Sequence, residues 1–216
     1  NIGVSPLEYL SKIKKNDKII LELSSFELEG LKQSPQIAVF TNILEDHLNR
    51  YASMSEYIEA KKNIFRFQNK EDYLILNEDD EIVKDFAKEA KARVYFYHST
   101  PVLAASAVAE ILGVLKKDIA KQIKTFKGVP HRQEFISEIK GVKYFNDTSA
   151  TMPDAVIFAL KSFKEKFGKS KIILIAGGQN KNLKYDKMAK EINKSVNYLV
   201  LLPGTASDII RNRVGK

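Results

Sequence analysis

The sequence predicts an α/β protein whose sheets are largely parallel and covered by helices on both faces. Short runs of β-branched and apolar residues alternate with longer amphipathic segments, which is typical of β-α-β units. The most apolar runs, 172–176 and 198–202, have the length of buried strands and fall far short of the roughly 18 residues that cross a bilayer. With 44% hydrophobic and 29% charged residues, the 216-residue chain has an ordinary globular composition, so we expect neither disorder nor a membrane span.

The expected strands are short apolar or β-branched runs, and the expected helices have apolar residues recurring every three to four positions. The strands are 18–23, 36–43, 72–77, 93–97, 143–146, 171–176 and 197–202. The helices are 53–66, 80–92, 102–112, 116–126, 153–164, 186–194 and 206–213.

A domain boundary is expected where Gly128 and Pro130 follow a helix, because both residues interrupt regular structure. A new strand is expected at 132–140. We therefore predict two α/β units, 1–129 and 130–216.

Charge and cysteine content exclude several classes of protein. The chain has 35 Lys and Arg against 27 Asp and Glu, a formal charge of +8, but no block of five basic residues. A solvated lysine-rich surface is therefore favoured over a nucleic-acid-binding patch. The absence of cysteine rules out disulfides, thiolate metal sites and cysteine nucleophiles, and it fits a reducing cytoplasm.

Two of the expected strands end in polar residues. Glu22 ends the strand 18–23, and Asn42 begins a polar stretch that reaches His47. Because ligands gather beyond the carboxyl ends of parallel strands, Glu22 is placed for a hard cation or a phosphate. The alternatives are a helix-capping or solvent-facing Glu22 and a structural His47.

Lys61 lies on the apolar side of the expected helix 53–66. At 100° per residue, Met54, Tyr57, Ile58, Ile64 and Phe65 occupy an arc of about 120° centred near Lys61, while Lys62 and Asn63 point elsewhere. A desolvated lysine has a lowered pKa, and its neutral amine can capture carbon dioxide as a carbamate, an oxygen ligand for Mg²⁺. The alternative is a lysine whose stem covers apolar surface and whose head reaches water.

The second unit has two candidate anion-binding segments. Asp147 ends a strand before Thr151 and Pro153, where the free N–H groups of a helix could hold an anion or Thr151 could merely cap the helix. Gly177 and Lys181 follow the next strand; the glycine permits close backbone approach and the lysine adds positive charge. The pattern is not G-x-G-x-x-G, so a dinucleotide fingerprint is not supported.

Taken together, these residues resemble the Mur ligase family over nearly the whole chain. Asp46-His47-Leu48 and Ala60-Lys61 are shared across the family. Two patterns, Glu-Leu-Ser-Ser-Phe and Asn-Asp-x-x-Ala-Thr, are more particular to D-glutamate-adding members. The matching segments occur in the family's order: Asn1-Ile2-Gly3, Glu22 to Phe26, Thr41-Asn42, Asp46 to Leu48, Tyr57 to Lys61, His131-Arg132, Asn146 to Thr148, Ala150-Thr151 and Gly177-Gly178 with Lys181.

The resemblance implies a P-loop-type central ATPase domain at 1–129 and a Rossmann-like C-terminal domain at 130–216, both partial. It implies a cytoplasmic, monomeric ligase of peptidoglycan precursor synthesis. ATP would phosphorylate the carboxylate of UDP-N-acetylmuramoyl-L-alanine, and the amine of D-glutamate would displace phosphate to form the amide. The implied cofactors are two Mg²⁺ ions, with ATP as co-substrate.

The resemblance also implies roles for particular residues. Glu22, His47 and carbamylated Lys61 match the catalytic and metal-binding positions. Asn1, Ser24 and Asn42, with Thr151 and Lys181, match substrate-binding positions, the last two in the D-glutamate pocket. Arg132 and Asp147 match nucleotide contacts.

The chain departs from the family pattern in three places. The phosphate-binding G-x-x-G-K-[ST] loop is expected upstream of Asn1, and further D-glutamate contacts are expected beyond Lys216. The adenine-side segment is replaced at 98–101, where we expect either a deletion or residues omitted from this sequence. The alternatives are a sister Mur or folylpolyglutamate-type ligase and a non-catalytic binding module derived from such a ligase.

Overall fold

A computed structural model describes residues 5–44, 50–98 and 100–215 of the chain. Its contacts divide the chain into two compact units. The first takes in Tyr51–Ile123 and the segment up to Ile43, and the second takes in Lys124 onward. The fold is mixed α/β, as the sequence predicts. Among the described residues, no helix is long and apolar enough to cross a membrane.

The first unit is built on a three-stranded parallel sheet in the order β1-β2-β3. Helical segments connect consecutive strands, which confirms the predicted β-α-β alternation. The strands are β1 (Ile37–Phe40), β2 (Tyr73–Asn77) and β3 (Arg93–Tyr97); the connections are α2 (Met54–Arg66), followed after β2 by α3 (Glu81–Asp85) and the 3₁₀ helix η2 (Phe86–Lys88).

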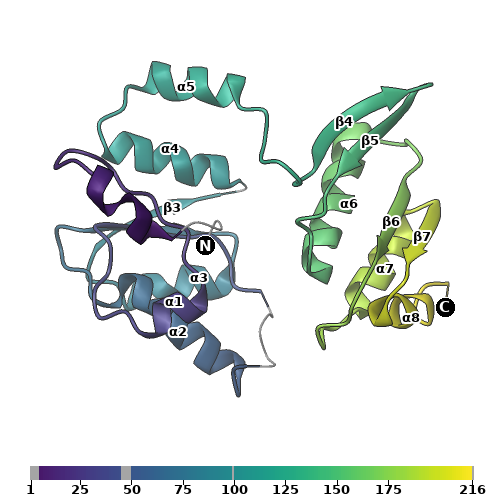
Figure 1. The fold of residues 1–216 in the computed structure, drawn as a ribbon, viewed down its shortest axis with the longest axis horizontal. Coiled ribbons are helices and arrows are strands. Elements are labelled where there is room, and N and C mark those ends of the chain that lie inside the picture. Colours follow the sequence, from purple (N-terminus) through teal and green to yellow (C-terminus); the bar gives the residue numbers. More distant parts are fainter. Residues whose placement is uncertain (1–4, 45–49, 99, 216) are drawn as a thin grey trace. The chain divides into compact units, whose positions relative to one another are not determined.

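Helices cover both faces of this sheet. Leu74 and Leu76 of β2 pack in a cluster with side chains of α2, α3 and η2, whereas Ile75 packs with Tyr97 and with Ala104 of α4 (Pro101–Ile111). Figure 1 shows α4 on one side of the sheet and α2 and α3 on the other. All three β2 side chains are fully buried, because consecutive residues of a strand face opposite layers.

The remaining elements of the first unit are helical. They are the 3₁₀ helix η1 (Pro6–Lys12), α1 (Ser25–Glu29) and α5 (Lys116–Thr125). The strand predicted at 18–23 is wrong: the segment has no regular secondary structure and pairs with no described strand, and Ile20 is 84% exposed. An apolar run lacking a neighbouring strand cannot satisfy its backbone groups in a ladder.

The second unit begins with an antiparallel hairpin and continues with two parallel strands. The hairpin turns at Lys140 and Gly141, which both have positive φ. Its elements are β4 (Glu134–Ile139), β5 (Val142–Asn146), α6 (Pro153–Phe167), β6 (Ile173–Gly177), α7 (Asp186–Ser195), β7 (Tyr198–Leu202) and α8 (Thr205–Arg211).

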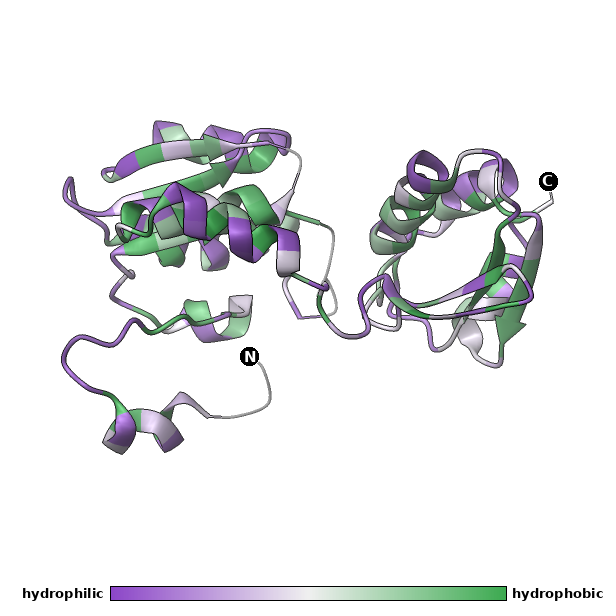
Figure 2. Cartoon of the chain, turned by 90° about the horizontal axis from the view of Figure 1, so that it is seen from above, coloured by the Kyte–Doolittle hydropathy of each residue, from purple (hydrophilic) through white to green (hydrophobic). Residues whose placement is uncertain are grey.

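The sheet formed by β6 and β7 is covered on one face. Leu174, Leu199 and Leu201 pack against a core that includes Met188 and Ile192 of α7. The alternate residues point away, and Ile175 is 64% exposed. The expectation that every sheet is covered on both faces is therefore wrong for this pair within the described part of the chain. Figure 2 shows hydrophobic stretches along the strands of both units.

Candidate active site

The segment from Glu22 to Ser25 leads into α1. Ser24 caps this helix: its backbone N–H donates to the Glu27 carboxylate at 2.7 Å, and its Oγ accepts from the Glu27 N–H at 3.4 Å. The hydrogen bond from the Ser24 backbone lowers the pKa of Glu27, and the Ser24 hydroxyl lowers it further. The Ser24 side chain thus has a structural role in addition to the predicted substrate contact.

Oxygen donors lie on both sides of this cap. Glu22 is exposed, and Ser25 Oγ is buried without a hydrogen-bond partner among the described residues. A carboxylate and a hydroxyl are the donors that a hard cation prefers, so this part of the chain suits Mg²⁺ chemically. The described residues contain no cluster of three Asp, Glu, His or Cys side chains able to hold a metal. His47 and Asn1 lie outside the described residues.

Lys61 lies on α2 against aromatic rings of the sheet side. Its Nζ lies 5.1 Å from the ring centroid of Tyr57 and 6.0 Å from that of Phe40, and the residue is half-buried. This placement agrees with the predicted apolar arc around Lys61. The aromatic faces attract the charged form of the amine, whereas burial disfavours it.

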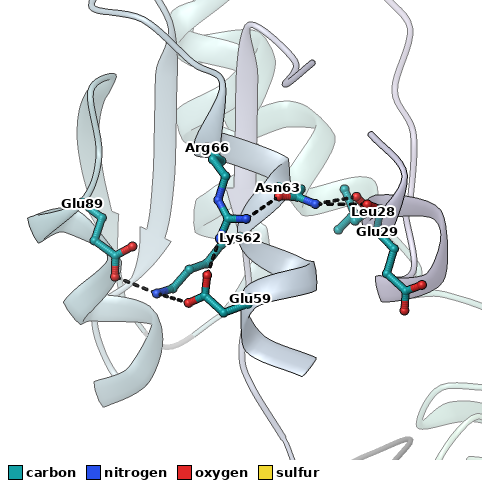
Figure 3. Close-up of polar contacts among 7 residues, drawn as sticks. All are labelled: Leu28, Glu29, Glu59, Lys62, Asn63, Arg66 and Glu89. Atoms are coloured by element: carbon teal, nitrogen blue, oxygen red, sulfur yellow. Dashed lines mark hydrogen bonds and ion pairs between the residues drawn. The ribbon is translucent and has the colours of Figure 1, made fainter. Parts of the chain in front are cut away.

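Lys62 and Asn63 point away from the apolar arc around Lys61, as predicted, but both pack against other segments of the chain. The Lys62 side chain is only 12% exposed and pairs with Glu59 at 2.9 Å and with Glu89 at 2.7 Å. Asn63 is 8% exposed and donates a hydrogen bond to the Leu28 carbonyl at 2.9 Å (Figure 3). Periodicity missed both because α2 packs against α1 and against the segment around Glu89 as well as the sheet.

Side chains at and just after the carboxyl end of β2 hold the polar stretch after β1. Asn77 Nδ2 donates to the Thr41 carbonyl and the Ile43 N–H donates to Asp80 Oδ2, both at 2.8 Å. Asn42 between them is exposed. The sequence reasoning did not single out Asn77 or Asp80, although Asn77 ends and Asp80 follows the apolar run of β2.

Another polar cluster follows β3, at the junction where a deletion is predicted. His98 Nε2 lies 2.9 Å from Glu78, and its Nδ1 lies 3.2 Å from Asp79. Burial raises the pKa of Tyr97 to about 12, and the charges of Asp79 and Asp80 act in the same direction. Acidic side chains therefore lie around His98, directly after β3.

In the second unit, Arg132 lies close enough to Asp147 for its charge to act on the carboxylate. The Gln133 N–H donates to Asp147 Oδ1 at 3.0 Å, and Asn146 Nδ2 lies 2.9 Å from His131 Nδ1. Burial raises the pKa of Asp147, while the Gln133 hydrogen bond and the Arg132 charge lower it. His131 and Gln133 both adopt positive φ, an uncommon conformation for residues other than glycine, and these contacts hold it.

At the end of β6, the backbone packs closely against Leu202 and Ser207. At Gly177, with φ of 136°, an added Cβ would lie 2.7 Å from the Leu202 carbonyl oxygen and against Ser207. Asn180 N–H donates to Thr205 Oγ1 at 2.9 Å. Thr151 and Lys181 are both exposed, and the described contacts show no hydrogen bond between their side chains.

Comparison with known proteins identifies the family. Residues 3–127 match the Mur ligase middle domain, and residues 131–214 match the Mur ligase, glutamate ligase domain. The chain belongs to the Mur ligase family. The predicted resemblance is therefore confirmed.

Curated proteins similar to this chain share one description. UDP-N-acetylmuramoylalanine--D-glutamate ligases of Acetivibrio thermocellus and Ruminiclostridium cellulolyticum are 37% and 38% identical over 248 aligned positions. Each alignment covers 97% of this Mur ligase chain and 52% of the relative, so the chain spans about half the length of the relatives it matches. Because 248 positions exceed the length of the chain, the relatives carry residues within the aligned span that it lacks.

Solved structures confirm the fold class. The UDP-N-acetylmuramate-alanine ligase of Thermotoga maritima superposes with a TM-score of 0.65 at 18% identity, covering 88% of this chain and 50% of its own. The MurF ligase of the same organism, in complex with ADP, gives 0.61 at 16% identity, covering 80% of this chain and 53% of its own. At these identities the likeness shows the fold alone.

Proposed function

We propose that this protein is an ATP-dependent ligase that adds D-glutamate to UDP-N-acetylmuramoyl-L-alanine in cytoplasmic peptidoglycan precursor synthesis. The observation that carries the proposal is the 37–38% identity to D-glutamate ligases over 97% of the chain. It is supported by the match to a glutamate ligase domain in the second unit.

The proposed reaction has two steps. ATP transfers its terminal phosphoryl group to the L-alanyl carboxylate, and the amine of D-glutamate then attacks the acyl phosphate to form the amide and release phosphate. Mg²⁺ supplies charge neutralisation for the phosphoryl group when bound. The residues of the chain hold ATP, the L-alanyl carboxylate and the amine of D-glutamate close to one another, beside oxygen donors and positive side chains.

In this proposal, the domain 1–129 holds the metal-binding residues. Glu22 binds the magnesium of the nucleotide, and His47 with carbamylated Lys61 binds a second ion. The exposed carboxylate of Glu22 and the half-buried position of Lys61 on its aromatic neighbours support these roles. The carbamate forms when the neutral Lys61 amine adds to carbon dioxide and loses a proton.

The remaining proposed roles lie with substrate and nucleotide. Asn1, Ser24 and Asn42 contact the muramoyl substrate, and Arg132 with Asp147 contacts the nucleotide. The exposure of Arg132 beside partly buried Asp147 supports a polar contact there.

Thr151 and Lys181 are proposed to contact D-glutamate. Lys181 supplies a positive charge for a carboxylate of the amino acid. Its exposed position after Gly178, where nothing lies within 4 Å of an added Cβ, supports access for a small anion.

The two proposed domains, 1–129 and 130–216, divide these roles between them. The first carries the residues for the metal and the muramoyl substrate. The second carries those for the nucleotide and the amino acid.

An amino-acid panel tests the reaction. With the protein expressed from its complete gene, phosphate release from ATP and UDP-N-acetylmuramoyl-L-alanine should require D-glutamate. Release with L-glutamate and a folate would instead identify a folylpolyglutamate-type ligase, which the homologues do not favour.

Lys61→Ala tests the metal-site assignment. The variant should lose activity by about a thousandfold or more, because a metal ligand near the transferring phosphoryl group is removed. Bicarbonate should not restore it. Lys62→Ala is the matched control, since its partners are Glu59 and Glu89, and it should retain ligation. Wild-type turnover by Lys61→Ala would overturn the assignment.

A further inference from the structure

Asn63 occupies an unusual position for a carboxamide on α2. Residues two apart on a helix are separated by about 200°, so Asn63 and Lys61 face opposite sides. Lys61 faces the rings of Phe40 and Tyr57, whereas Asn63 is buried against α1. A buried polar side chain is retained at little cost only when it is hydrogen-bonded.

The hydrogen bonds of Asn63 join two helices. Its Nδ2 donates to the Leu28 carbonyl at 2.9 Å and approaches the Glu29 carbonyl at 3.5 Å, both in the last turn of α1. Its Oδ1 accepts from Arg66 Nη1 at 2.9 Å, one turn along α2. Figure 3 shows the carboxamide lying between Arg66 and the end of α1.

A second contact holds α2 on another side. Lys62 pairs with Glu89 and with Glu59, and its Nζ lies 5.4 Å from the ring centroid of Phe86. Arg66 also pairs with Glu59. The carboxylates that pair with Lys62 are half exposed, so the buried hydrogen bonds of Asn63 are the contacts that restrict rotation of α2 about its own axis, and that rotation sets where Lys61 points.

The same contacts reach the segment of Glu22. Because α1 has only five residues, tertiary packing rather than its own hydrogen bonds must stabilise it. Its first turn follows Glu22 and carries the capping residue Ser24 and the buried Ser25, while its last turn accepts the Asn63 hydrogen bonds. Asn63 therefore links the helix of Lys61 to the short helix that follows Glu22.

We propose that Asn63 is a positioning residue for the divalent cation, which fixes Lys61 and the Glu22–Ser25 segment relative to each other. The inference rests on the proposed function, because Glu22 and Lys61 bind magnesium only in that proposal. Asn63 itself contacts neither metal nor substrate.

Asn63→Asp tests the link with little change in shape. Aspartate keeps the oxygen that accepts from Arg66 but removes the donor to Leu28 and sets a carboxylate against that carbonyl. Gln68→Leu is the matched control: Gln68 is also a buried carboxamide, donating to the carbonyls of Pro35 and Tyr73 at 2.8 and 2.9 Å, at the amino ends of β1 and β2. Both variants should lower the unfolding temperature.

The deciding readout is binding of Mn²⁺, an oxygen-preferring substitute for Mg²⁺, followed by the electron paramagnetic resonance of the free ion. The protein expressed from its complete gene is titrated at a temperature where every variant is folded. Asn63→Asp should weaken binding by about tenfold or more, as removal of outer hydrogen-bond partners of metal ligands does. Gln68→Leu should match the unaltered protein, and Glu22→Gln with Lys61→Ala should define the signal without the site.

The outcomes separate the two proposals. Undiminished Mn²⁺ affinity in Asn63→Asp, or equal losses in Asn63→Asp and Gln68→Leu, would overturn the positioning role and leave the ligase function standing. Mn²⁺ binding that is insensitive to Glu22→Gln with Lys61→Ala would overturn the metal assignment and the positioning role with it. In the ligase assay, Asn63→Asp should raise the Mg²⁺ concentration for half-maximal rate more than it lowers the rate at saturating Mg²⁺.

Discussion

The strand β2 in the first unit and the pair β6 and β7 in the second are apolar runs of similar character with different surroundings. In β2, Leu74, Ile75 and Leu76 are all fully buried. In β6, Leu174 packs inward while Ile175 is 64% exposed. An apolar run therefore identifies a strand but not the number of layers around it, which depends on helices supplied by other parts of the chain.

Truncation of one residue in each sheet should separate the two environments most strongly. Leu74→Ala should lower the free energy of unfolding by about 3 kcal/mol, because it leaves a cavity in a closed core. Ile175→Ala should change it by about 0.5 kcal/mol or less, as exposed substitutions do. Urea denaturation measures both, and similar losses would show that the outer face of β6 is buried in solution.

Glycine substitutions test how tightly the second unit packs despite its open sheet face. Gly177→Ala should cost roughly 2–3 kcal/mol, because the new Cβ meets the Leu202 carbonyl and Ser207 at a positive φ. Gly178→Ala is the control, since its φ is also positive but nothing lies within 4 Å of the added carbon, so only backbone strain remains. Equal thermal shifts for the two variants would contradict the close approach.

The acids of the two units should respond to pH in opposite directions. The Lys62 hydrogen bond lowers the pKa of Glu59 below 4.5, so its contribution is present above that value and is lost as the pH falls through the lowered pKa. Burial raises the pKa of Asp147 above 3.8, so the folded state binds more protons there and stability falls as the pH rises through that window.

Glu59→Gln and Asp147→Asn each remove one of these titrating groups. The difference in unfolding free energy between each variant and the unaltered protein should therefore change between about pH 3 and 6, in opposite directions for the two variants. These effects are the smallest predicted, because Glu59 is half exposed and solvent screens its charges. Unfolding free energies measured across this range check the signs. Parallel slopes would contradict the assigned causes.

Most of the fold could be predicted from the sequence because its elements follow local rules. The five-residue runs at β2, β3 and β7 were predicted within a residue of their ends, since β-branched and aromatic residues cluster there. The strand predicted at 18–23 fails because a ladder needs a partner strand, and local composition carries no information about one. The hairpin of β4 and β5 departs from parallel pairing through its tight turn at Lys140 and Gly141.

The candidate site was less predictable. Periodicity placed Lys61 on the sheet side of α2 correctly, because that face follows the 3.6-residue repeat. It could not reveal Asn63 or Lys62, since their burial comes from segments 27 and more residues away in sequence. The roles of Glu22, Thr151, Lys181 and Arg132 remain predictions from the family resemblance.

The central position of β2 in its sheet also determines how fast its backbone amide protons exchange with solvent. Its N–H groups lie in ladders with β1 on one side and β3 on the other, beneath side chains that water does not reach. Deuterium can replace those protons only when the whole first unit opens. In the described chain, β6 and β7 pair only with each other, so smaller openings expose them and their amides should exchange first.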